Sequence, residues 1–198
     1  TMKSMKKTWG AAVVAAGLTW AGQAQAATTA DLTVTVTIQV VSIGASFRAA
    51  GATFALGSIA AGSNNLIGDP ITITNSGNVT ETYNLRVTAE PNGTWASVTA
   101  APGAEQYQMS GVFRAPAAAA PGTGDYVDGS DDYSVATVRT ADGANVLAVN
   151  ADAGGAGTKG FQMSASSNLY LWLRFKAPTS TAITTSQSIV TRITAATP

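Results

Sequence analysis

The sequence predicts an all-β protein, folded as an antiparallel β-sandwich. First, roughly eight to ten short segments alternate apolar and polar residues, and turn residues separate them at intervals of about 8 to 12 positions. Second, these segments are rich in Val, Ile and Thr, whose branched side chains favour extended chain. Third, no segment of about ten residues or more after the first 26 positions shows a helical period.

The clearest predicted strand lies at residues 31–43. Apolar residues occupy every second position there, and threonines and one glutamine occupy the positions between them. This alternation is typical of a strand with one buried face. At about 3.3 Å per residue the segment could extend about 40 Å, which is long for a strand of a small domain. Its apolar set consists of Leu32, Val34, Val36, Ile38 and Val40.

The following segments predict further strands. Residues 54–62 alternate around Phe54 and are punctuated by glycines. Residues 69–77 and 80–88 also alternate, and the polar turn residues between them predict an antiparallel hairpin. Residues 95–99 and 107–113 are predicted as additional strands.

An Ala-, Pro- and Asp-rich insert then occupies about residues 114–160. Pro116 and Pro121 limit its alanine run to about one helical turn, so we expect loop there. Residues 133–139 and 145–149 are predicted as short strands within the insert. After it, residues 169–176 place Leu169, Leu171, Leu173 and Phe175 on one face of a strand, and residues 184–195 predict the last strand.

Residues 1–26 have the composition of a cleaved secretory signal peptide. Three lysines precede a short apolar run, and Ala24, Gln25 and Ala26 have the small-x-small form of a cleavage site. The apolar run is shorter than the roughly 20 residues that a spanning helix needs. We therefore expect secretion, no membrane contact after cleavage, an N-terminal strand at 27–43 and a sandwich domain at 44–198.

The charge balance argues against a nucleic-acid partner. Eight basic and eleven acidic residues remain after the predicted cleavage, a net charge of −3 with no basic patch. Charged residues make up 11% of the chain, against about 25% in typical soluble proteins. A Thr-rich surface with few charges favours packing against identical copies.

The absence of Cys and His narrows the chemistry. It excludes disulfides and thiolate catalysis, and it removes the commonest metal ligand and general base. The many Ser and Thr hydroxyls have no His to activate them. Glu81, Glu90 and Glu105 lie near turn signals without an evident partner. We therefore expect neither an enzyme nor a bound cofactor.

Two weaker ligand sites can be read from the sequence. Asp125, Asp128, Asp131 and Asp132 place four carboxylates within eight residues, which makes them a candidate calcium site without EF-hand spacing. The alternative is a solvated acidic loop. Asn78 and Asn92 begin Asn-x-Thr triplets and are candidate glycosylation sites.

Several of these segments resemble secreted subunits of prokaryotic surface fibres. The resemblance rests on the Thr/Val strand, on Phe-x-Leu-Gly-x-Ile-x-x-Gly at 54–62, on Ile-Thr-Ile-Thr-Asn-Ser-Gly at 71–77, and on segments 82–87 and 171–178. Camelysin-type biofilm fibre subunits and archaeal bundling pili are the families concerned. The resemblance implies jelly-roll or immunoglobulin-like subunits that assemble by donor-strand exchange, with residues near 31–41 filling a groove in the next copy.

The expected function is thus a structural subunit of a cell-surface filament, a pilus or fibre that polymerises head to tail with identical subunits. Two alternatives stay open. One is a monomeric adhesion module that binds glycan through Trp95, Tyr170 or Trp172, although such aromatics more often fill a core or a subunit contact. The other is a surface-layer lattice protein.

Overall fold

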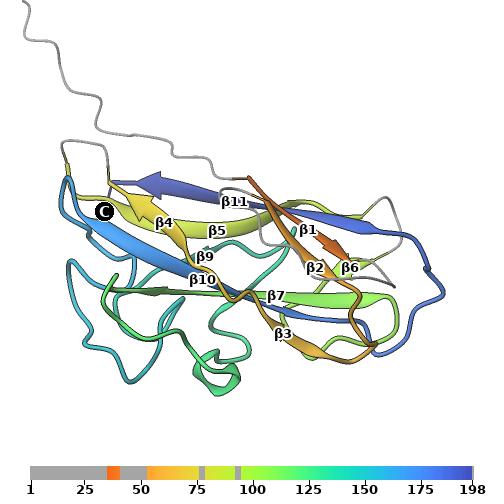
Figure 1. The fold of residues 1–198 in the computed structure, drawn as a ribbon. Coiled ribbons are helices and arrows are strands. Elements are labelled where there is room, and N and C mark those ends of the chain that lie inside the picture. Colours follow the sequence, from red (N-terminus) through yellow and green to blue (C-terminus); the bar gives the residue numbers. More distant parts are fainter. Residues whose placement is uncertain (1–34, 41–52, 76–78, 92–94, 198) are drawn as a thin grey trace, which may run out of the picture.

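The computed structural model describes residues 35–40, 53–75, 79–91 and 95–197, which form two packed β-sheets (Figure 1). Sheet A has the strand order β2, β1, β11, β5, β9, and sheet B has the order β3, β10, β7, β6, with β4 beside β10 and β8 beside β7. Apart from the short 3-10 helix η1 (Thr123–Asp125), these residues contain no helix. The all-β prediction is therefore confirmed. The strands are β1 (Thr35–Val40), β2 (Thr53–Gly57), β3 (Asn64–Leu66), β4 (Ile71–Thr74), β5 (Thr82–Ala89), β6 (Ala96–Ser97), β7 (Gln106–Arg114), β8 (Asp132–Tyr133), β9 (Arg139–Thr140), β10 (Asn168–Lys176) and β11 (Gln187–Ala196).

Alternate positions of the long strands fill the space between the two sheets. Leu171 and Phe175 of β10 are fully buried, as are Ile189 and Ile193 of β11. These side chains belong to one core cluster to which both sheets contribute. The apolar face predicted for residues 169–176 is thus the inner face of sheet B.

The hairpin predicted for residues 69–77 and 80–88 is wrong. β4 pairs with β10, with Ile71 opposite Leu171, whereas β5 pairs with β11, with Leu85 opposite Ile193. The residues between β4 and β5 therefore connect sheet B to sheet A. Turn chemistry does not distinguish these cases, because polar turn residues suit a hairpin and a crossing between layers equally well.

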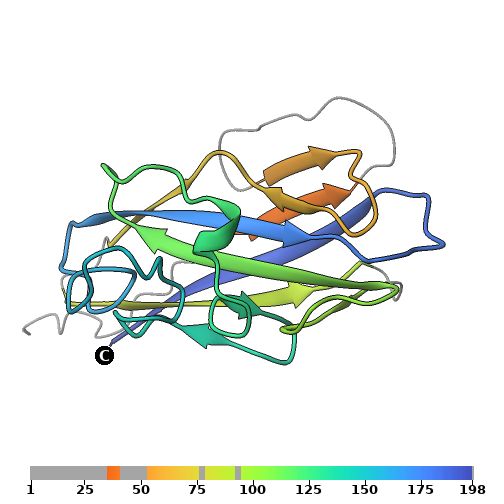
Figure 2. The ribbon, with the colours of Figure 1, turned by 90° about the horizontal axis from the view of Figure 1, so that it is seen from below.

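The insert at 115–160 covers the outer face of sheet B with loops. In Figure 2 the green segment that contains η1 crosses in front of β7 and β10. Tyr126 and Val149 of the insert form a second apolar cluster with Val112 of β7 and Trp172 of β10. The strands predicted within the insert are shorter in the structure: β8 and β9 have two residues each, and an isolated bridge joins Ala148 to Phe113.

The predicted signal peptide at 1–26 lies outside the described residues. Within the part of the chain that the structure describes, no helix is long and apolar enough to cross a membrane.

Candidate assembly interface and the acidic loop

The predicted polymerisation strand corresponds to β1, which the structure pairs within its own chain, inside sheet A between β11 and β2. It runs antiparallel to β11, from Thr35 opposite Arg192 to Val40 opposite Gln187, and parallel to β2. The predicted apolar positions Val36, Ile38 and Val40 lie opposite Thr191, Ile189 and Gln187, and those three partners are buried. Leu32 and Val34 lie outside the described residues.

β1 is also the link between β2 and the rest of sheet A. Among the described strands β2 pairs with β1 alone, and Phe54 of β2, which is buried, lies opposite Ile38. Without β1, the backbone groups of β11 at 187–192 and of β2 would lose their partners. β1 therefore fills a slot with a strand edge on each side.

The connection from β1 to β2 is short for parallel neighbours. Twelve residues, 41–52, separate the end of β1 from the start of β2, and Thr37 pairs with Thr53. Parallel neighbours need a crossover of about a dozen residues or more, and it usually contains a helix. The interval available here lies at that minimum.

The acidic loop, residues 125–132, is attached to sheet B through Asp132, which is fully buried. Its carboxylate accepts hydrogen bonds from the Ser110 hydroxyl, from Gln108 Nε2 at 2.9 Å and from the Gly129 N–H at 2.7 Å. Arg174 Nη2 lies 3.3 Å from Asp132 Oδ1. Burial raises the pKa of Asp132, and the hydrogen bonds and Arg174 oppose that rise.

Arg174 is the buried cation that pairs with Asp128 and Asp132 of this loop. Its Nη2 donates to Asp128 Oδ1 at 2.7 Å and to the Ser110 hydroxyl at 2.8 Å, and its guanidinium carbon lies 5.0 Å from the centre of the Tyr126 ring. The alternation of 169–176 placed this side chain on the outer face, but sequence reasoning missed its burial. The charge complementarity between an outward-facing strand arginine and an acid-rich insert was the signal available.

Asp131 attaches the loop to a second part of the insert. It accepts hydrogen bonds from the Val127 N–H at 2.7 Å and from the Ala148 N–H at 3.1 Å, and it is fully buried. Burial raises its pKa to about 6, against the effect of those N–H groups, and the neighbouring charge of Asp132 raises it further. No cation pairs with this carboxylate among the described residues.

The four predicted calcium ligands are therefore engaged by the protein itself. Asp128 binds Arg174 and Lys176, Asp125 accepts from the Gly122 N–H, and Asp131 and Asp132 are bound as above. Burial alone would raise the pKa of Asp128, but the hydrogen bonds from Lys176 and Arg174 outweigh it and lower that pKa. Within the described ranges, no group of three or more acidic side chains could hold a metal ion. The four carboxylates of the loop thus have partners within the protein, and Asp131 and Asp132 are buried rather than solvated.

The candidate glycan platform is largely buried. Trp95 packs against Tyr107 and Phe175 in the main core, and its Nε1 donates to Thr181 at 3.0 Å. Trp172 lies beneath the insert and is 8% exposed. Only Tyr170 is partly accessible. Neither tryptophan presents a ring face to a sugar. Both are core residues, which was the alternative to a glycan site.

The three glutamates considered for catalysis each have local partners. Glu81 is buried and accepts a long hydrogen bond from the Tyr83 hydroxyl, 3.3 Å. Glu90 accepts from Ser97, and Glu105 accepts from the Ala182 N–H and the Thr181 hydroxyl. The glycosylation candidates Asn78 and Asn92 lie outside the described residues.

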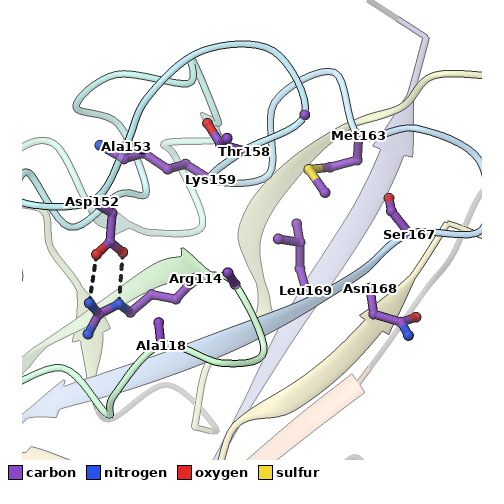
Figure 3. A pocket seen from close by; sticks show the side chains of 12 residues that line it. Arg114, Ala118, Asp152, Ala153, Thr158, Lys159, Met163, Ser167, Asn168 and Leu169 are labelled. Carbon is purple, nitrogen blue, oxygen red and sulfur yellow. Dashed lines mark hydrogen bonds and ion pairs between the residues drawn. The ribbon is translucent and has the colours of Figure 1, made fainter.

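A pocket of about 360 Å³ opens at the end of the sandwich where β10 begins (Figure 3). One wall carries an ion pair with two contacts, Arg114 Nε to Asp152 Oδ2 at 2.8 Å and Nη2 to Oδ1 at 2.6 Å. Met163 and Leu169 line the opposite side. The Lys159 amine donates to the Ala144 carbonyl at 2.9 Å. The charged groups that line the pocket are thus already paired.

Comparisons with protein-family models, with curated proteins and with solved structures found no match for this chain.

Proposed function

We propose that the protein is a structural subunit of an extracellular filament that polymerises head to tail, each copy donating its first strand to the next. The observation that carries this proposal is the position of β1. It sits between β11 and β2, bound along both edges, and a minimal connection joins it to the strand it runs parallel with.

A strand of the same chain and a strand of another copy can both fill the slot between β11 and β2. Backbone hydrogen bonds and alternating side-chain positions bind β1, and an extended segment of another molecule makes the same contacts. A strand that arrives from another copy also needs no crossover connection to lie parallel to β2. The interval at 41–52 just meets the length that such a crossover needs, so it permits pairing within one chain as well as donation.

β11 offers a longer edge than the described part of β1 uses. Residues 193–196 pair with β5 on one side, and the described pairings place no strand on the other. A donated strand that continued the register of β1 would place Val34 opposite Ile193 and Leu32 opposite Ala195. Both of those β11 residues are buried. The full apolar alternation of residues 32–40 then matches one continuous edge.

Donation of this kind is heterologous, because the donating and accepting surfaces differ. Such contacts do not close on themselves unless the geometry forms a ring, so they generate filaments. The predicted signal peptide and the low charge of the chain fit a secreted polymer. A surface-layer lattice uses the same kind of contact, and electron microscopy of the assembled protein distinguishes sheets from filaments.

A disulfide trap tests donation directly, since the chain contains no cysteine of its own. Gln39 lies opposite Ser188 in the register of β1 and β11. Directly opposed residues of antiparallel strands have Cα atoms about 4.5–5.5 Å apart, which a disulfide spans. Oxidising the assembled Gln39→Cys/Ser188→Cys variant should give a ladder of covalent multimers on a non-reducing gel. Exclusively monomeric disulfides would contradict donation.

The control moves one cysteine along the same strand. Gln39→Cys combined with Thr194→Cys places the partner six residues, about 20 Å, away from the matching position. This pair should form no ladder under the same oxidation. Equal cross-linking of both pairs would indicate random contact, and it would remove the support for a defined slot.

A further inference from the structure

Lys159 carries the one charge in the wall of the 360 Å³ pocket that no opposite charge neutralises. Arg114 and Asp152, the other two charged residues of the wall, neutralise each other through their two contacts. Lys159 is only 4% exposed, its amine donates to the Ala144 carbonyl, and none of the ion pairs among the described residues includes it. Two positive charges and one negative charge leave the wall with a net positive charge.

A single carbonyl does not offset the cost of burying an ammonium group. Lysine is almost never buried without a partner of opposite charge, because the charged amine loses its hydration. The amine of Lys159 has three N–H donors, and the Ala144 carbonyl is its one acceptor among the described residues. A neutral donor, such as the amide of a glutamine, would suffice to bind that carbonyl. The positive charge of Lys159 therefore suits an anion that enters the pocket.

The backbone that places Lys159 in this wall has an uncommon conformation. Lys159 has φ +49°, in the left-handed region that residues with a side chain rarely adopt. Gly157 and Gly160, which flank it, have φ values of +78° and +77°. Such strained backbone persists only where the surrounding structure holds it, and it is concentrated at active sites and ligand sites. The turn at 157–160 thus buries a charged side chain that would otherwise favour solvent.

The remaining wall of the pocket suits the apolar body of a small molecule. Met163 and Leu169 line one side, and Figure 3 shows Lys159 on the other side, near the ion pair of Arg114 and Asp152. Pockets for small ligands have volumes of about 300–1,000 Å³, mostly apolar walls and a few polar groups that fix the orientation of the ligand. At about 360 Å³ this pocket lies at the small end of that range.

We propose that this pocket binds a small carboxylate with an apolar body. The carboxylate pairs with Lys159, and the body contacts Met163 and Leu169. A hydrogen bond between two charged groups is stronger than one between neutral groups, and it is strengthened further where water is excluded. No residue that lines the pocket belongs to β1, β2 or β11, so the site is separate from the slot of the first strand and does not depend on polymerisation.

Isothermal titration calorimetry of the purified protein tests this site with two carboxylates, octanoate and N-acetyl-leucine. At least one of them should bind saturably, with one site per chain. Tighter binding of octanoate would identify an acyl chain as the ligand body, and tighter binding of N-acetyl-leucine would identify the carboxyl end of a peptide. Octanol, which has the length of octanoate without its charge, should bind at least about tenfold more weakly than octanoate. Absence of saturable binding by both carboxylates overturns the proposal.

Matched variants separate the charge of Lys159 from the shape of the pocket. Lys159→Met keeps an unbranched side chain without the charge, so it should weaken carboxylate binding by about tenfold or more and leave octanol binding unchanged. Ala118→Phe fills the pocket from an exposed loop and should abolish binding of both kinds of ligand. Ala120→Phe is the control, because Ala120 is exposed on the same loop and does not line the pocket. Undiminished carboxylate binding by Lys159→Met or by Ala118→Phe overturns the proposal, and so does its loss in Ala120→Phe.

Discussion

At the scale of single residues, the attachment of the insert depends on Arg174. Its guanidinium contacts Ser110 of β7 and Asp128 and Tyr126 of the insert, and it lies beside the fully buried Asp132. A buried ion pair adds little net stability by itself, because both ions lose water. Its importance appears when one partner is removed, since the other charge is then left buried and alone.

Replacing Arg174 with Ala should lower the free energy of unfolding by about 3 to 5 kcal/mol, because Asp132 keeps its charge without a cation. Urea unfolding followed by tryptophan fluorescence measures the change. Arg86→Ala is the matched control: this exposed arginine pairs with no carboxylate, so its removal should cost at most about 0.5 kcal/mol. Similar losses for both variants would show that Arg174 has no special role.

The raised pKa of Asp131 predicts an unusual pH dependence of the free energy of unfolding. Its folded-state pKa, raised to about 6 by burial, exceeds the value of an unfolded aspartate, so the folded protein binds the proton more tightly. The free energy of unfolding should therefore fall as pH rises from about 4 to about 6, by at most about 3 kcal/mol. Asp128 acts in the opposite direction: its lowered pKa gives stability that is lost as pH falls through and below about 4.

Asp131→Asn should reduce the slope between pH 4.5 and pH 6.5, whatever it does to the absolute stability, and Asp132, whose pKa burial also raises, accounts for the part that remains. Denaturant titrations at these two pH values measure the slope for both proteins. Asp142→Asn is the control: burial alone would raise the pKa of the Asp142 carboxylate, but backbone N–H groups outweigh it and hold that pKa below its usual value, so its removal should leave the slope between pH 4.5 and pH 6.5 as it is. A parent protein whose stability does not fall over this range would contradict the assignment.

At the scale of elements, the end of the insert packs tightly against β7. Gly160 has φ +77°, and a Cβ added there would lie 2.6 Å from a ring carbon of Phe113. Its carbonyl also accepts a hydrogen bond from the Tyr83 N–H of β5 at 2.9 Å. This glycine therefore joins the insert to both sheets at a point without room for a side chain.

Gly160→Ala should destabilise the fold by about 2 to 4 kcal/mol, through left-handed backbone strain and the clash with Phe113. Thermal unfolding followed by circular dichroism measures the loss. Gly124→Ala in η1 meets no atom within 4 Å and has no left-handed backbone, so it should be nearly neutral. A stable Gly160→Ala protein would mean that the insert can detach from the sheets.

The first strand is the element on which the proposed function depends. Deleting residues 27–40 removes β1 and the alternating segment before it, leaving β11 and β2 without their shared partner. The truncated protein should still be secreted, should form no filaments in negative-stain micrographs, and should accept a synthetic peptide of residues 31–40. Filaments formed without β1 would rule out strand donation, whereas a protein that binds the peptide but stays monomeric would support it.

At the scale of the whole molecule, the local alternation of apolar and polar residues predicted where the strands lie better than it predicted what packs against them. The alternation in 169–176 identified a strand and its inner face because that face meets the main core. The same alternation predicted that the other face of this strand is exposed, and that prediction was wrong. Trp172 and Arg174 belong to an outward-facing set, yet the insert buries both. Sequence periodicity reports one interface of a strand, and it does not reveal whether a third layer covers the other.

The amino-acid sequence alone determined the all-β class, the positions of the long strands, and the absence of cysteine and histidine chemistry. The tertiary structure decided which strands pair, the placement of β4 and β5 in different sheets, and the role of the aspartates as internal ligands of Arg174 and of backbone N–H groups. The physical reason is the separation along the chain over which each interaction acts. Alternation and turn preference act between near neighbours in the chain, whereas pairing, burial and charge neutralisation join residues that are far apart in sequence, such as Asp132 and Arg174.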